Sequence, residues 1–290
     1  FFTTGDYNTF IGSEAGRGAS GASTGNQNTA VGYASGYSLT TGTNNSYVGL
    51  WSGFTTSTGA SNVAMGAYAS RYNTTGSNNV ALGADALNAN TTASNNTAVG
   101  RSALAALTTA SGITAVGYNS GLSVTTGVNN AFFGAQAGDS VTTGHSNTIM
   151  GANAGMDLIT GHSNTFIGEE AGQNNVGSAN TFLGAFAGEN YNGGSNNVAI
   201  GRAALLGVDG SSTGSANIAI GFNAMLANTT GASNTAVGYV ALSANTTAGN
   251  NTAVGLQSLD ACTTGASNSA VGVNALGTLT TGAACVALGD

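Results

Sequence analysis

Residues 228–255 read NTTGASNTAVGYVALSANTTAGNNTAVG, and this stretch holds two copies of a motif that fills the chain. Each copy closes on what we call an anchor glycine. Of the 16 intervals between anchor glycines, 13 are 17 residues, two are 20 and one is 16. A period of this length predicts a solenoid, in which each repeat buries its apolar side chains against its neighbours. The anchor glycines are Gly12, Gly32, Gly49, Gly66, Gly83, Gly100, Gly117, Gly134, Gly151, Gly168, Gly184, Gly201, Gly221, Gly238, Gly255, Gly272 and Gly289.

The segment before each anchor glycine is short and apolar. Its last residue is apolar in all 17 repeats, and the residue before that is Ala in eleven and Phe, Tyr or Ile in six. Such segments between glycine and TTG turn signals predict strands, and two turn signals per repeat indicate two short strands in each coil. We therefore expect an all-β fold, a parallel β-solenoid (β-roll) of about seventeen 17-residue coils. Residues 1–290 would form a single repeat domain, which we interpret as a segment of a longer fibrous protein.

Two columns of the repeat exchange large side chains for small ones. Seven repeats carry Leu or Met four residues after the anchor, and all seven have Ala two residues before it. Where Gly or Ser replaces that Leu, the earlier residue is Phe, Tyr or Ile in six of nine repeats. Cores keep a nearly constant packing density, so the two columns are predicted to fill the same space.

The residue just before the anchor points to the opposite face of its strand, because side chains alternate along a strand. A strand that is apolar on both faces must be covered on both, and one coil covers only one of them. We therefore expect parallel self-association, as a homotrimer or a higher assembly, along a seam of these residues. The predicted seam residues are Val31, Val48, Met65, Leu82, Val99, Val116, Val237, Val254 and Val271.

Asparagine stands four residues before the anchor in 15 repeats, with Ile113 and Cys285 as the exceptions. Identical amides one coil apart can hydrogen-bond along the stack and fix its register. We favour this structural ladder, and an exposed ladder for ligand binding is the alternative. The predicted ladder is Asn28, Asn45, Asn62, Asn79, Asn96, Asn130, Asn147, Asn164, Asn180, Asn197, Asn217, Asn234, Asn251 and Asn268.

The composition excludes several classes of partner. The chain has no lysine, four arginines and eleven acidic residues, which gives a net charge of −7. A nucleic-acid partner needs clustered cations to neutralise its phosphates, so we expect none. No apolar run of transmembrane length occurs, so we expect no membrane insertion in this segment. The surface of Asn, Thr and Ser suits an extracellular setting, with a host-surface glycan or protein as a further partner.

Few residues suggest chemistry. His145 and His162 share a column six before their anchors and are candidate metal ligands, but no Cys or carboxylate column accompanies them. The carboxylates are scattered, and the adjacent pair Glu169 and Glu170 faces opposite sides of its strand. We therefore predict no catalytic residues, no cofactor and no enzyme activity. Cys262 and Cys285 lie in different columns, so we expect two free, largely buried thiols.

Some side chains interrupt the polar pattern of the outer turns. Exposed aromatics there could stack on sugar rings, and packing against the neighbouring turn is the alternative: Trp51, Tyr33, Tyr118, Phe222 and Tyr239. Two repeats are 20 residues long, with insertions around Ser20 to Ala22 and Gly207 to Gly210 that predict outward loops. Four NTT strings match a glycosylation sequon but follow from the repeat itself: Asn73, Asn90, Asn228 and Asn245.

The strings NNVALG, NNVAIG, NIAIG and SNNTAVG resemble the head repeats of YadA-like trimeric autotransporter adhesins. Residues 228–255 are similar to shaft repeats in tail-fibre proteins of phage and phage-like origin. The resemblance covers the whole chain and implies a left-handed parallel β-roll in which three chains associate. YadA-like repeats are shorter than these, so the resemblance leaves the loop shape open.

These observations favour a structural protein over an enzyme. Our leading hypothesis is the shaft or head of an extracellular trimeric fibre that mediates attachment, as a phage-type tail fibre or a bacterial surface adhesin. A self-polymerising extracellular matrix filament is one alternative. An ice-binding solenoid is another, suggested by the threonine that stands eight residues before the anchor in 15 repeats.

Overall fold

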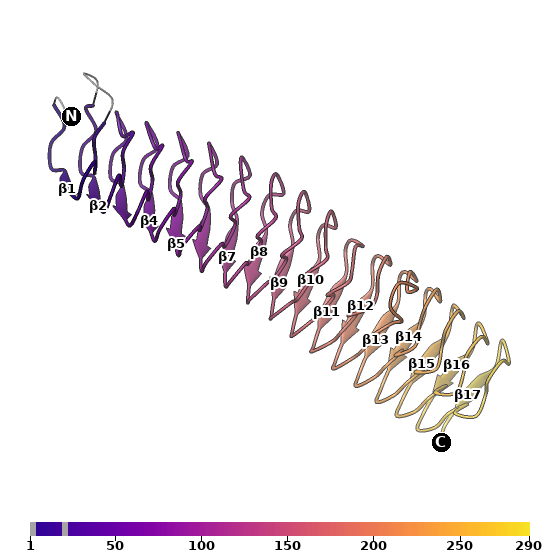
Figure 1. Cartoon of the computed structure of the whole chain (residues 1–290). Coiled ribbons are helices and arrows are strands. Elements are labelled where there is room, and N and C mark those ends of the chain that lie inside the picture. The colour runs from indigo at the N-terminus through magenta and orange to yellow at the C-terminus, as the bar shows by residue number, and fades with distance from the viewer. Residues whose placement is uncertain (1–3, 19–22) are drawn as a thin grey trace. The chain divides into compact units, whose positions relative to one another are not determined.

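The computed structural model describes residues 4–18 and 23–290. Throughout these residues the chain is all-β, with one short strand per repeat and no helix. The chain divides into two compact units, Phe1–His145 and Ser146–Asp290, each of which is described by itself. Within each unit one repeat forms one coil, and the strand arrows of successive coils follow one another (Figure 1). The predicted parallel β-solenoid is therefore confirmed.

The first unit stacks its strands in parallel and in the same register. In β6 and β7, for example, Ala98 pairs with Ala115 and Val99 with Val116. Each strand thus places equivalent residues of the repeat next to one another. The strands of this unit are β1 (Thr9–Ile11), β2 (Thr29–Val31), β3 (Ser46–Val48), β4 (Val63–Met65), β5 (Val80–Leu82), β6 (Thr97–Val99), β7 (Thr114–Val116) and β8 (Ala131–Phe133).

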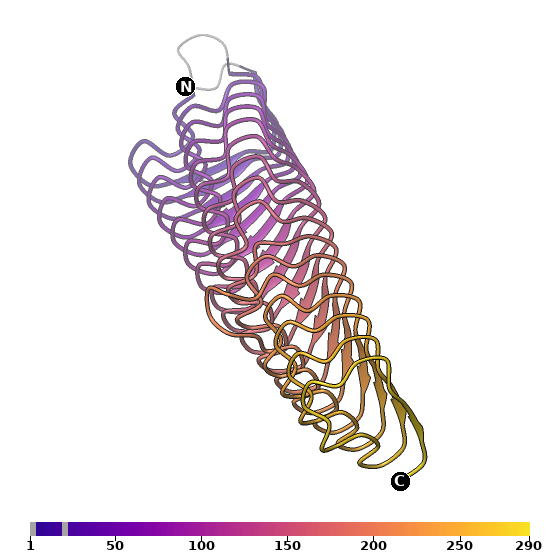
Figure 2. The same ribbon diagram turned by 90° about the vertical axis from the view of Figure 1, so that its right-hand side faces the viewer.

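The second unit repeats the arrangement, and the strands of a unit lie side by side along one wall of its coils (Figure 2). Between β14 and β15, Ala236 pairs with Ala253 and Val237 with Val254. The strands of this unit are β9 (Thr148–Met150), β10 (Thr165–Ile167), β11 (Thr181–Leu183), β12 (Val198–Ile200), β13 (Ile218–Ile220), β14 (Thr235–Val237), β15 (Thr252–Val254), β16 (Ser269–Val271) and β17 (Val286–Leu288).

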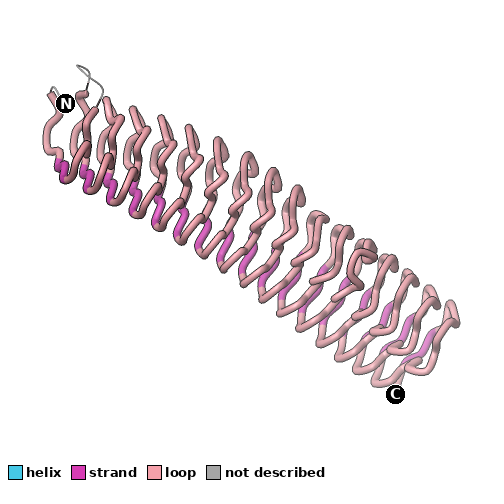
Figure 3. Tube along the Cα trace, viewed as in Figure 1, coloured by secondary structure: helices cyan, strands magenta, loops and turns pink. Residues whose placement is uncertain are grey.

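The expectation of two strands per coil is wrong, because each described repeat has a single three-residue strand and is otherwise loop (Figure 3). Left-handed residues interrupt the rest of the coil. In one repeat these are Tyr68 (φ 63°), Ser70 (φ 51°) and Asn78 (φ 58°). The loop backbone still bonds to the next coil, since the amide of Thr74 donates to the carbonyl of Thr91 at 2.8 Å. The stack is therefore hydrogen-bonded outside its strands as well.

The anchor glycine ends each strand in a conformation that side chains rarely adopt. Its φ lies between 118° and 146° in all 17 repeats. The neighbouring backbone is also close: a Cβ atom on Gly83 would lie 2.5 Å from the carbonyl oxygen of Gly100. Glycine meets both demands, since it populates positive φ freely and has no Cβ. This explains why the period is marked by glycine and by no other residue.

The core of each unit is filled by the two columns that the sequence linked. Tyr47 and Ala64, two residues before their anchors, are fully buried. A Cβ atom on Gly53 would lie 2.7 Å from the ring of Tyr47, so a large residue before the anchor excludes a side chain after it. Where that residue is Ala, as in β5, Leu87 fills the interior and is fully buried. The predicted exchange of large for small side chains is confirmed.

Candidate functional site

The asparagine column forms hydrogen-bonded ladders inside the coils of each unit. The Nδ2 group of Asn45 donates to Oδ1 of Asn28 at 3.1 Å and to the carbonyl of Gly59 at 2.9 Å. Its Oδ1 accepts from the backbone N–H of Asn62 at 2.9 Å and from Nδ2 of Asn62 at 3.1 Å. All hydrogen-bonding capacity of this amide is used, as burial of a polar group requires. Asn45 therefore joins three consecutive coils.

The 14 predicted ladder asparagines are each at most 2% exposed. A ligand cannot reach them, so they hold the coils in register and do not form a binding surface. At the first exception, the backbone N–H of Ile113 still donates to Oδ1 of Asn96 at 3.0 Å. At the second, the N–H of Cys285 donates to Oδ1 of Asn268 at 2.9 Å.

The asparagines of the four NTT strings are also fully buried. Asn73 is representative: its Nδ2 donates to the carbonyl of Gly76 at 2.9 Å, and its Oδ1 accepts from the N–H of Gly76 at 2.9 Å. The side chain thus closes the TTG turn from the inside. These amides are out of reach for a glycosylating enzyme in the folded chain.

The predicted seam residues lie on the outer face of the strands. The middle residue of each strand from β2 to β16 is buried, whereas the residue just before the anchor is half-buried or exposed. Met65 is 48% exposed and Val271 is 41% exposed. The first residue of each strand, such as Thr97 in β6, shares this outer face. Each unit therefore carries an outward column of apolar side chains along its strands.

The two histidines are exposed on the outer turns. His162 belongs to the second unit, and its Nδ1 lies 3.4 Å from the hydroxyl of Ser163. His145 closes the first unit, so the two histidines belong to different units and their role as metal ligands stays a prediction. Among the described residues, no group of three or more His, Cys, Asp or Glu side chains could hold a metal ion.

Glu189 in the second unit lies within electrostatic reach of two other carboxylates, those of Glu170 and Asp209. Partial burial raises the pKa of Glu189, and the charges of Glu170 and Asp209 raise it further. Glu169 is exposed and Glu170 is half-buried.

Both cysteines are free thiols. Cys262 is buried, its Sγ lies 3.4 Å from the carbonyl of Gly265, and burial raises the pKa of this thiol. Cys285 is half-buried. A raised pKa keeps a thiol protonated and weakly reactive at neutral pH, so Cys262 fills the core as a small apolar side chain would.

Aromatic side chains and an arginine form a continuous cluster on the outer turns of the first unit. Trp51 stacks on Phe54 at a centroid distance of 5.4 Å, and Phe54 stacks on Tyr37 at 4.9 Å. The guanidinium carbon of Arg71 lies 4.2 Å from the centroid of the Trp51 ring. We call this cluster the aromatic patch, and its members are Tyr37, Trp51, Phe54, Tyr68, Arg71 and Tyr72.

Among these residues, only Trp51 was predicted from the sequence as an exposed aromatic side chain. The signal for the others was their place in the repeat. Trp51 and Tyr68 stand two residues after their anchors, and Tyr37, Phe54 and Arg71 stand five residues after theirs. The structure shows that these two columns are neighbours on the outer turn, which spacing alone did not reveal.

The other outer aromatics are more scattered. Tyr33 is 52% exposed and Tyr118 is 48% exposed. In the second unit Phe222 stacks on Tyr239 at 5.2 Å, and the guanidinium carbon of Arg202 lies 5.8 Å from the centroid of the Phe222 ring. These rings pack along neighbouring coils and thereby shield one another from water.

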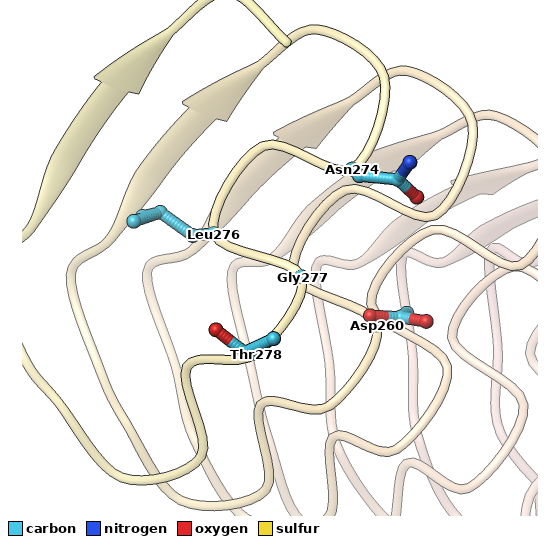
Figure 4. Close-up of a pocket in the computed structure, with 5 residues that line it drawn as sticks. All are labelled: Asp260, Asn274, Leu276, Gly277 and Thr278. Carbon is cyan, nitrogen blue, oxygen red and sulfur yellow. The ribbon is translucent and has the colours of Figure 1, made fainter.

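A shallow pocket of about 340 Å³ lies in the second unit on the outer turns after β15 and β16. Figure 4 shows Leu276 pointing away from Asn274 and Asp260. The lining thus brings together one carboxylate and one amide, which can bind a polar molecule but supply no pair of catalytic groups. The lining residues are Asp260, Asn274, Leu276, Gly277 and Thr278.

The insertion around Gly207 to Gly210 forms an outward loop in which Val208 is 47% exposed. Ser212 holds its base: its hydroxyl accepts from the N–H of Val208 at 2.7 Å and donates to the carbonyl of Asn228 at 2.9 Å. The loop is therefore tied to the next coil. The other insertion, Ser20 to Ala22, lies outside the described residues.

Comparison with known proteins gives no match: no family model, no curated protein and no solved structure is significantly similar to this chain. Residues 4–18 and 23–290 also contain no helix with the length and hydropathy needed to cross a lipid bilayer.

Proposed function

We propose that this chain is a structural segment, the shaft or head, of an extracellular fibre in which three parallel copies associate and mediate attachment. A phage-type tail fibre and a bacterial surface adhesin are the two settings that fit. The parallel stacking of near-identical coils in each unit supports a role in which the repeat supplies length and stiffness. The resemblance of the repeats to YadA-like heads and tail-fibre shafts points the same way.

One observation carries the proposal: the outward residue just before the anchor is apolar in every strand. Apolar surface of this regularity is uncommon on a chain whose charged residues make up only 5% of the sequence. Val99 and Val116, paired in β6 and β7, show the arrangement at the level of two coils. A second and a third copy that present the same column would cover these side chains along a shared axis, with parallel chains giving every coil an equivalent contact.

The oligomeric mass tests this proposal directly. One chain has a mass of 28.0 kDa, so light scattering on the purified protein should give three times that value over a wide concentration range. A mass of one chain at every concentration would contradict it. A mass that keeps rising with concentration would favour the self-polymerising filament instead.

A pair of substitutions locates the contact. Val99→Asp with Val116→Asp places charges in the seam, and burying unpaired carboxylates there should convert trimers to monomers. Thr92→Asp with Thr109→Asp is the matched control, because these threonines are exposed on the turns of the same two repeats. The control should keep the trimer mass, and circular dichroism should show the same β-structure in both variants.

The threonine columns bear on the ice-binding alternative. Thr91, the first threonine of its pair, is half-buried, and its hydroxyl donates to the carbonyl of Thr108 at 3.2 Å. Thr92, the second, is exposed. The other described TTG and TTA turns expose only the second threonine as well, except the last, where Thr280 and Thr281 are both exposed. A single row of exposed threonines offers less matched surface to ice than two adjacent rows would. A thermal-hysteresis measurement on the purified protein should show no effect.

A further inference from the structure

The aromatic patch is the place where the outer turns depart most from the repeat. The columns two and five residues after the anchor hold mainly small, polar or acidic residues elsewhere, such as Ser102, Asn119 and Gln136. Between residues 37 and 72 the same columns hold aromatic rings and an arginine, including the only tryptophan of the chain. Stacking coils does not require these side chains, since the other repeats stack without them.

The guanidinium of Arg71 contacts three aromatic rings, and no acidic side chain of the described residues pairs with it. Its guanidinium carbon lies 4.2 Å from the ring centroid of Trp51, 5.3 Å from that of Tyr68 and 4.9 Å from that of Tyr72. In the described part of the chain its side chain makes no hydrogen bond and no ion pair. Contact with aromatic faces fixes the plane of the guanidinium and leaves its fork of donors unused.

Arg17 gives an internal comparison. It also lies over a ring, 5.4 Å from the centroid of Tyr37, but its Nη1 donates to Glu14 at 2.8 Å and to the hydroxyl of Tyr37 at 2.8 Å. The charge of Arg17 is thus matched within the chain. The charge of Arg71 is not matched by any of the described residues, although the protein carries an excess of acidic residues.

Two donors in the patch are also enclosed without an acceptor. Among the described residues, the indole Nε1 of Trp51 and the Nε of Arg71 are both buried and have no hydrogen-bond partner. Native proteins rarely leave buried N–H groups unpaired, because such a group loses its hydrogen bond to water without a replacement. The two atoms themselves are enclosed, but Arg71 as a whole is only half-buried, so a ligand that brings acceptors of its own fits the rest of its guanidinium.

We propose that the aromatic patch binds a saccharide that carries a carboxylate group. The guanidinium of Arg71 takes the carboxylate with two parallel N–H donors, which is the geometry that the fork of arginine matches. The ring of Tyr72, which is 44% exposed, offers its face to the apolar side of the sugar. A nucleic acid does not fit, because four arginines and no lysine cannot neutralise a run of phosphates. This proposal rests on the attachment role proposed above and names the chemistry of what is attached.

The single tryptophan makes the test specific, because Trp51 emission reports on the patch and on no other part of the chain. The protein is titrated with tetragalacturonic acid while tryptophan emission is recorded, and the fully methyl-esterified tetrasaccharide serves as the uncharged match. The acid should change the emission in a saturable way, and the ester should bind at least about tenfold more weakly, since charge-assisted hydrogen bonds contribute about 1.5–3 kcal/mol. Equal binding of acid and ester, or no saturable change with the acid, overturns the proposal.

Substitutions assign the effect to one side chain. Arg71→Gln should weaken binding of the acid about tenfold or more, and Arg71→Lys should weaken it less, because the charge remains while the fork is lost. Arg202→Gln is the control, since Arg202 also lies over two rings, those of Phe186 and Phe222. An equal loss in Arg71→Gln and Arg202→Gln would overturn the proposal, because it would indicate a general charge effect.

Light scattering on the same samples separates this proposal from the trimer. Saturable binding by a protein of single-chain mass would support the saccharide site and contradict the proposal of a trimeric fibre. Tryptophan emission that depends on protein concentration without sugar would show that a second copy covers the patch, which would overturn the saccharide site while supporting self-association.

Discussion

Within the second unit, the coil interior is filled differently around β10 and β11 than around β14 and β15. In the first pair, Phe166 and Phe182 enter from the strand and stack at a centroid distance of 5.0 Å with an interplanar angle of 9°. In the second pair the strand contributes only Ala, and a leucine enters from the turn after the anchor. Leu242 and Leu259 are both fully buried there.

The comparison shows that the same backbone conformation accommodates both kinds of core. We call coils whose strand contributes a Phe to the core the Phe coils, and those whose strand contributes only Ala the Ala coils. Gly172 in the Phe coils has a φ of 60°, and Leu242 at the equivalent position in the Ala coils has a φ of 52°. A left-handed leucine costs roughly 1–2 kcal/mol that a glycine does not. The Ala coils carry this cost because no other side chain fills the space. In the Phe coils a Cβ atom on Gly172 would lie 2.8 Å from the ring of Phe166. A leucine therefore cannot replace this glycine while the ring is present.

The largest loss of stability should come from removing the buried ring from one of the Phe coils. Phe182→Ala removes a fully buried ring, and Gly188 on the turn offers nothing to replace it. Deletion of a buried Phe side chain costs about 3–5 kcal/mol, because the cavity closes only in part. Denaturant unfolding followed by circular dichroism should show a loss of this size. A loss under about 1 kcal/mol would mean that the coil collapses around the missing ring.

The sequence was enough to predict the solenoid, its parallel register and the exchange between Phe182-type and Leu242-type residues. Each depends only on which residues recur at a fixed spacing. The single strand per coil could not be predicted, because a left-handed leucine or tyrosine leaves no trace in residue identity. The aromatic patch was missed for a related reason: the contact between Trp51 and Arg71 depends on how the outer turn folds. What covers the seam stays a prediction.

A second substitution should restore part of the stability lost in Phe182→Ala. Gly188→Leu alone should destabilise the chain by about 1–3 kcal/mol, because a Cβ atom at Gly188 would lie 2.4 Å from an atom of the Phe182 ring. In the double variant the leucine enters space that the phenylalanine has left, as Leu242 does in the Ala coils. The double variant should therefore be about 2 kcal/mol more stable than Phe182→Ala, within the range measured for contacting residues.

The control for this exchange is the same leucine in a coil that keeps its ring. Gly172→Leu together with Phe182→Ala places the new side chain against Phe166 and leaves the cavity empty. The two losses should then add, with no recovery. If Gly188→Leu gave no recovery either, the two columns would not share one space, and the comparison between the two kinds of coil would fail.

The smallest effect concerns Tyr191, whose hydroxyl bonds to asparagines of two later repeats. It belongs to the repeat that ends in β12, and its hydroxyl accepts from Nδ2 of Asn217 at 3.2 Å and from Nδ2 of Asn228 at 2.8 Å. Burial raises the pKa of Tyr191 to about 12, from an ordinary value of 10.0. The unfolded chain therefore loses this proton at lower pH than the folded chain does.

Stability should fall as the pH rises through this window, because ionisation first favours the unfolded state. The contribution is complete well below about pH 10 and should be reduced by about 1.4 kcal/mol at about pH 11, roughly one unit above the pKa of the unfolded chain. Tyr191→Phe cannot ionise, so the free energy of unfolding of the wild type should drop relative to this variant between about pH 8 and pH 11. The other tyrosines titrate alike in both proteins and cancel in the difference. A constant difference across that range would show that the hydroxyl is not enclosed, and that the coils around β12 open to water where the two kinds of core meet.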